Sequence, residues 1–107
     1  MLLNLTPHAI VVRTADGVDV TYDPCGTVAR VTTTEEVVAT EYGAPIVRRT
    51  FGGVTGLPQD DTPCLVSSMV LSAIPAGTPG VYAPDTGPTA VRDDAGRIVA
   101  VTRLVAA

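Results

Sequence analysis

The sequence predicts a mostly β protein: a small sandwich or barrel-like antiparallel sheet with about one short α-helix near residues 68–74. Six to eight runs of β-branched residues recur every eight to twelve residues, and turns rich in glycine, proline and aspartate separate them. One apolar stretch in the second half begins with serines that suit a helix N-terminus. No repeat or linker interrupts the 107 residues, so residues 1–107 form a single domain.

The first half of the chain carries most of the predicted strands. Asp16 and Gly17 lie between the apolar runs AIVVRT and VDVTY, and an aspartate–glycine pair in this position is a strong hairpin signal. Residues 35–41 (EEVVATE) fit a strand or a single helical turn, and the flanking β-branched residues favour the strand. The predicted strands of this half are residues 9–14, 18–22, 27–34, 35–41 and 45–51.

The second half begins with a long connection, residues 52–63, whose glycines and prolines predict a loop. Residues 64–67 (CLVS) predict a short buried strand, and Ser67 or Ser68 is expected to cap the helix that follows. Prolines and glycines at 75–80 end that helix. After a rigid loop within residues 81–92, the run RIVAVTRLV (97–105) predicts one long last strand.

Composition limits the partners of the protein. The net charge of −4 argues against nucleic acid, which needs a basic stripe to neutralise phosphates. No apolar run is long enough to span a membrane, and the first residues lack the features of a signal peptide, so we expect a cytoplasmic protein. A hydrophobic content of 46% exceeds what one small core needs and leaves apolar surface for a second copy.

The two cysteines predict neither a disulfide framework nor a metal site. Cys25 and Cys64 form no C-x-x-C pair, and one histidine with two distant cysteines makes a poor zinc ligand set. We therefore expect free thiols, with Cys64 buried and Cys25 in a turn, and no cofactor. All seven basic residues are arginines, so any bound anion would meet guanidinium groups, which grip phosphate or carboxylate through two hydrogen bonds.

The loop VYAPDTGPTAVR, residues 81–92, is the strongest candidate for a binding site. Its prolines and glycine predict an ordered, tightly turned loop, on which Asp85 and Thr86 either cap backbone N–H groups or meet a ligand. Arg92 can reach back over the loop with its fork of donors. The predicted ligand-binding residues of the whole chain are His8, Arg30, Arg48, Arg49, Phe51, Asp85, Thr86 and Arg92.

The candidates outside this loop each have a structural alternative. His8 either turns the chain into the first long strand or contacts a ligand, and catalysis would need partners that its sequence neighbours do not supply. Arg48 and Arg49 are adjacent in a strand and so point to opposite faces. Phe51 either plugs the core or closes a flap over a ligand; the neighbouring glycines lack the G-K-[ST] of a P-loop.

Several of these segments occur together in a known group of proteins. The opening LTPH (5–8), the segments FG (51–52) and GLP (56–58), and the loop APDTGP (83–88) resemble small, uncharacterised proteins encoded by phages and prophages. The resemblance covers nearly the whole chain. It implies a phage origin and action in the cytoplasm of an infected bacterium, and it implies no activity.

Three classes of function follow from these observations. The first is a non-enzymatic, homo-oligomeric protein that sequesters a small anionic ligand, such as a nucleotide-type immune signal of the host. In this class the arginines hold phosphates while His8, Phe51, Asp85 and Thr86 orient a base or ribose. The alternative is a virion accessory or a module that binds a host protein. A small hydrolase centred on His8 with Asp85 or a serine ranks last.

Overall fold

The computed structural model describes residues 2–107 and confirms a mostly β protein with one short helix. Its strands form one four-stranded sheet and three two-stranded hairpins, and no sheet in this part of the chain closes into a barrel. The elements are β1 (Leu3–Asn4), β2 (Ile10–Arg13), β3 (Asp19–Tyr22), β4 (Arg30–Glu41), β5 (Ala44–Thr55), β6 (Cys64–Leu65), α1 (Ser68–Ala73), β7 (Val81–Pro84), β8 (Val91–Arg92), β9 (Ile98–Ala100) and β10 (Leu104–Ala106).

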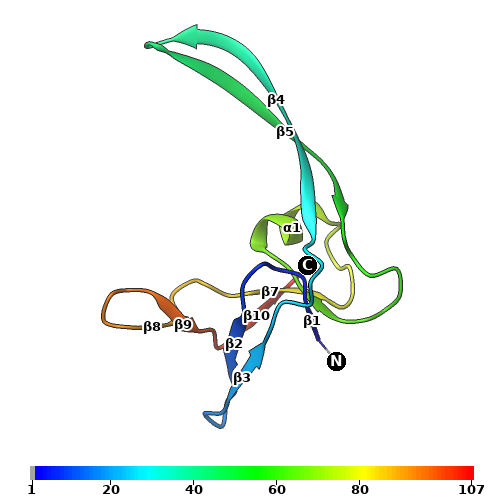
Figure 1. The fold of residues 1–107 in the computed structure, drawn as a ribbon, viewed down its shortest axis with the longest axis vertical. Helices are drawn as coiled ribbons and strands as arrows, with labels where there is room; N and C mark the ends of the chain where they lie inside the picture. The colour runs from blue at the N-terminus through cyan, green and yellow to red at the C-terminus, as the bar shows by residue number, and fades with distance from the viewer. Residues whose placement is uncertain (1) are drawn as a thin grey trace.

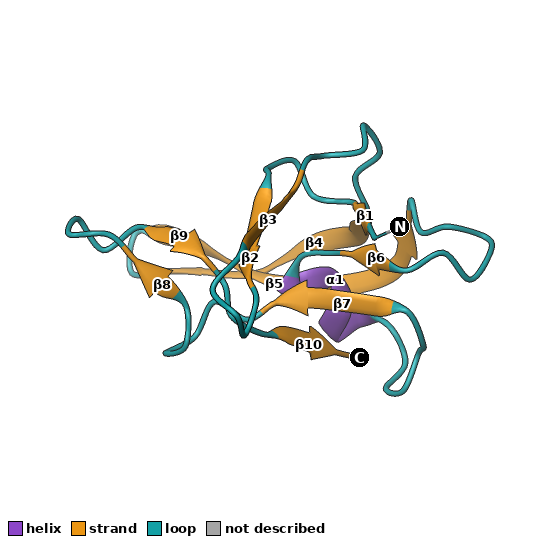
Figure 2. Ribbon diagram, turned by 90° about the horizontal axis from the view of Figure 1, so that it is seen from below, coloured by secondary structure: helices purple, strands orange, loops and turns teal. Residues whose placement is uncertain are grey.

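The central sheet has the strand order β1-β6-β7-β10 and is not wholly antiparallel. β1, β6 and β7 run parallel, and only β10 lies antiparallel to β7, so the predicted antiparallel sheet is wrong here. A strand at residues 64–67 and the helix after it are predicted, whereas β7 lies at the start of the segment predicted as a rigid loop, and the pairing of β6 with β7 is not predicted. Parallel neighbours need a crossover, and α1 provides it between β6 and β7 (Figure 2).

The helix α1 begins at Ser68 as the sequence predicts and ends at Ala73, one residue before the predicted end. Ser67 is its N-cap, and the Ser67 hydroxyl accepts a hydrogen bond of 3.3 Å from the backbone N–H of Val70. Val70 is buried against the sheet, whereas Met69 faces outward. Among residues 2–107 no helix is long and apolar enough to cross a membrane.

The hydrophobic core is small and lies between the central sheet, α1 and the start of β4. Its buried cluster is Leu5, Ala29, Cys64, Val66, Val70 and Val81. Both cysteines are free and Cys64 is buried, as predicted, and Cys25 is exposed. Burial raises the pKa of the Cys64 thiol. The radius of gyration is 16.6 Å, whereas a compact chain of this length would have about 13 Å. Much of the chain therefore lies outside the core.

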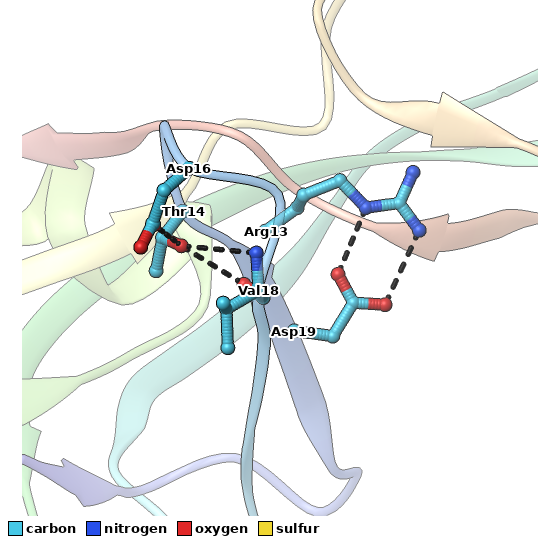
Figure 3. A network of polar contacts seen from close by, with 5 residues as sticks. All are labelled: Arg13, Thr14, Asp16, Val18 and Asp19. Atoms are coloured by element: carbon cyan, nitrogen blue, oxygen red, sulfur yellow. Dashed lines mark hydrogen bonds and ion pairs between the residues drawn. The ribbon is translucent and has the colours of Figure 1, made fainter.

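The hairpin of β2 and β3 forms at the predicted Asp16–Gly17 turn. The Arg13 Nε donates to Asp19 Oδ1 over 2.8 Å, and a second guanidinium N–H reaches Asp19 Oδ2 over 3.2 Å (Figure 3). Thr14 bonds to Asp16 and accepts from the Val18 N–H over 3.2 Å, which closes the turn. Backbone hydrogen bonds between β2 and Val101 tie the hairpin to the rest of the molecule.

The strands β4 and β5, twelve residues each, form a long hairpin that we call the arm, residues 30–55. The arm projects away from the rest of the fold (Figure 1). Residues 27–34 and 35–41 were expected as separate elements, and 52–63 as a loop. Instead residues 30–41 form one strand and residues 52–55 belong to β5, because Val54 pairs with Val31 and both pack against the core.

The predicted single strand over residues 97–105 is wrong. It is divided into β9 and β10, which pair with β8 and β7 respectively. The break has a local cause: the Val101 carbonyl accepts from the Arg13 N–H over 2.8 Å, and the Val101 N–H donates to the Val11 carbonyl over 2.9 Å. The chain therefore contacts β2 at Val101 before it turns into the central sheet.

Candidate functional site

The LTPH turn is held by a buried asparagine. Asn4 is only 1% exposed, and its Nδ2 donates to the carbonyls of His8 and Tyr22, each over 2.8 Å. The Asn4 Oδ1 accepts from the Thr6 N–H over 3.0 Å and lies 2.6 Å from the Thr6 hydroxyl. Asn4 therefore joins β1, the turn and β3, and its network positions the backbone of His8.

His8 borders a hollow of the surface, which we call the His8 groove. The groove has a volume of about 590 Å³ and is formed by residues 6–11, 66–67, 84, 86 and 98–101. Most of its lining is apolar, and Thr6, His8, Ser67 and Thr86 add polar groups. An apolar hollow with a few polar groups is the usual form of a small-molecule site.

The loop after β7 is ordered largely by its own contacts. Asp85 Oδ1 accepts from the Gly87 N–H over 3.0 Å, while Asp85 Oδ2 pairs with the Arg103 guanidinium at 2.6 Å. Arg92 donates to the carbonyls of Gly96, over 2.8 Å, and Thr86, over 3.3 Å. The predicted reach of Arg92 over its loop is confirmed, and both its bonds are to backbone.

These contacts give a pH-dependent contribution to stability. The Gly87 N–H and the Arg103 guanidinium hold the pKa of the Asp85 carboxyl below its usual value. A lowered folded-state pKa means that the stabilisation is present above the unfolded pKa, about 4, and is lost as the pH falls through the folded pKa. We expect Asp85→Asn to lower the melting temperature by a few degrees at neutral pH, and this gap to narrow below about pH 4.

Thermal unfolding of the wild type and Asp85→Asn between neutral and acidic pH measures that gap. Asp94→Asn removes an exposed carboxyl from the turn after β8 and is the matched control. A gap that stays constant over the whole pH range would contradict the contribution of the ionised Asp85.

The remaining predicted residues lie elsewhere. Arg30 lines a hollow of about 270 Å³ beside Leu5 and Val70. Phe51 is 52% exposed and lines another of about 370 Å³ with Met69 and the last turn of α1. Of the eight predicted residues, His8 and Thr86 both line the His8 groove.

The two adjacent arginines lie on the arm, on opposite faces as expected. Arg49 pairs with Glu35, the Nη2 and Oε1 atoms being 2.7 Å apart, and both side chains are about half exposed. Arg48 lies opposite Glu36 in the register of β4 and β5. The arm also exposes large apolar side chains: Val37, Val38, Ile46, Val47 and Phe51.

Sequence reasoning missed three partners of the site. Asn4 lies in the apolar run LLNL, and its position two residues before Thr6-Pro7-His8 is the available signal. Arg103 and Glu35 pair with Asp85 and Arg49 from strands distant in sequence, so no local pattern could identify them. Within residues 2–107 no three His, Cys, Asp or Glu side chains are grouped to hold a metal ion.

In a comparison with known proteins, no family model, curated protein or solved structure matches the chain.

Proposed function

We propose that the protein is a non-enzymatic binding module that works as a homo-oligomer assembled through the arm. The observation that carries the proposal is the arm itself. It is a two-stranded hairpin of twelve-residue strands, and each strand has an edge that pairs with no other strand of residues 2–107. An isolated two-stranded hairpin is marginally stable in water, and its free edges are templates for pairing with another chain.

The side chains of the arm support the same proposal. Val37 is 60% exposed and Val47 is 45% exposed, and these two residues lie opposite each other on one face. Ile46 is exposed on the other face, since neighbouring residues of a strand point to opposite sides. Apolar surface gathered on a projecting element favours association with a partner. The resemblance to phage-encoded proteins further supports a role in the cytoplasm of an infected bacterium.

The His8 groove supports a second candidate function, the binding of a small anionic molecule of nucleotide type. Its apolar lining suits a base, and His8 and Thr86 offer polar contacts. In an oligomer, an arginine of a neighbouring copy would supply the phosphate contact that the groove lining lacks. Sequestration of a host signal is the activity that this arrangement would serve.

The first test is the mass of the protein in solution. We expect the wild type to sediment as an oligomer, and Val47→Glu to weaken association about 100-fold, because it buries an unpaired charge in the contact. Val18→Glu is the matched control, since Val18 is 54% exposed at the β2–β3 turn, outside the arm. A folded wild type that stays monomeric at high concentration would overturn the proposal.

A further inference from the structure

The two strands of the arm carry opposite charges. Beyond its first residue, β4 has three charged side chains, and all are acidic: Glu35, Glu36 and Glu41. The only charged side chains of β5 are Arg48 and Arg49. Because the sheet has two strands, the free edge of β4 is bordered by carboxylates and the free edge of β5 by guanidinium groups.

The charges are also arranged by face and by register. On one face Glu35 lies opposite Arg49, and Val37 lies opposite Val47 two residues further along. On the other face Glu36 lies opposite Arg48. No bulge interrupts residues 35–37 or 47–49, so one alignment of β4 with β5 matches the charges on both faces and the valines together.

From this pattern we propose that the free edge of β5 pairs with the free edge of β4 in a second copy, so that the arms form a continuous antiparallel sheet. The inference rests on the proposed assembly through the arm. Within each arm β4 and β5 run in opposite directions. When two arms lie side by side and point the same way, β5 of one copy is therefore antiparallel to β4 of the other. Arg49 then lies between two Glu35 side chains, its own and the neighbour's, and Val47 likewise lies between two Val37 side chains.

The alternative, a two-fold pairing of identical edges, is opposed by the same charges. A β4–β4 pair centred between residues 35 and 36 sets Glu35 against Glu36, and a β5–β5 pair centred between residues 48 and 49 sets Arg48 against Arg49. Other registers of β5 with β5 leave both arginines without a carboxylate opposite them. Like charges directly opposite one another destabilise a sheet. Pairing unlike edges leaves one free edge on each end copy, so assembly continues beyond a dimer until a ring closes.

A charge-swapped arm tests this edge pairing. The fourfold variant Glu35→Arg, Glu36→Arg, Arg48→Glu, Arg49→Glu inverts both edges and keeps every opposite-charge pair inside the hairpin. We expect it to assemble with itself as the wild type does. When mass-labelled wild type and the variant are unfolded, mixed and refolded, native mass spectrometry should show mixed oligomers at least about tenfold below their statistical share.

Each outcome of the mixing experiment decides a separate question. Two homo-oligomers of more than two copies that exclude each other support the unlike-edge pairing. Oligomers that mix in preference to self-assembly overturn it and still place the contact on the arm. Oligomers that mix statistically also overturn it, and Val47→Glu then decides whether the arm takes part in the assembly. A folded monomeric wild type overturns the proposed function itself. If circular dichroism shows the fourfold variant to be unfolded, Glu36→Arg with Arg48→Glu makes the same test on one face.

Discussion

Gly56→Ala, which adds one methyl group, is expected to lower the free energy of unfolding by about 3–5 kcal/mol, a large effect for so small a change. Gly56 follows β5 with a φ of +88°, a conformation that costs a residue with a side chain about 1–2 kcal/mol. A Cβ at this position would also lie 2.7 Å from the Val28 carbonyl oxygen and 3.1 Å from the Ala29 Cα. These atoms are backbone at the base of the arm, so they cannot rotate away.

A second glycine with a similar φ separates the two causes of this loss of stability, the steric clash and the unfavourable dihedral angle. Gly17 has a φ of +83° but has no atom within 4 Å of the added Cβ, so Gly17→Ala should cost only about 1–2 kcal/mol. Urea denaturation of both variants and the wild type measures the difference. Equal losses for the two variants would show that the backbone at Val28 and Ala29 yields without cost.

Asn4→Ala is the second substitution with a large expected effect, a loss of about 3 kcal/mol, or a melting temperature lower by roughly 12–24 °C. The change removes four contacts, among them the one that the N–H of Thr6 makes to the Asn4 side chain. Since Asn4 is buried, water cannot replace those contacts freely.

A graded control follows from the geometry of that network. Thr6→Val keeps the shape of the side chain and removes only the hydroxyl, which lies 2.6 Å from Asn4 Oδ1, so we expect a loss of about 1 kcal/mol. Thermal and urea unfolding of both variants give the comparison. An Asn4→Ala protein as stable as Thr6→Val would mean that the asparagine does not join β1 to β3.

Local signals predicted most of the elements correctly. The Asp16–Gly17 turn, the Ser67 cap and the prolines after α1 act through neighbouring residues, and the structure confirms all three. The division of residues 97–105 and the parallel pairing of β6 with β7 depend on partners distant in sequence. Hydrophobic alternation alone therefore could not predict them.

The candidate site was predictable only where a residue acts on its own loop. Arg92 bonds to backbone within six residues, and the composition of the loop indicated as much. The partner of Asp85 is Arg103, eighteen residues away on the other side of β8 and β9, and nothing near Asp85 points to it. The sequence does not predict the full length of the arm, because glycines such as Gly52 and Gly53 usually interrupt a strand. Here both lie within β5.

The order in which the chain leaves the ribosome gives the arm a further consequence. β4 and β5 are joined by a short turn and contact each other locally, so they can form as soon as residue 55 has emerged. The central sheet forms later, because β1 pairs with β6 some sixty residues further along the chain and β7 pairs with β10, the last of its four strands to emerge. During synthesis the two strands of the arm are therefore expected to pair before the body forms, as a hairpin that is only marginally stable until a neighbour or the body supports it. When two nascent chains meet, the opposite charges of the edges then favour contact between β5 of one arm and β4 of the other, and disfavour contact between identical edges.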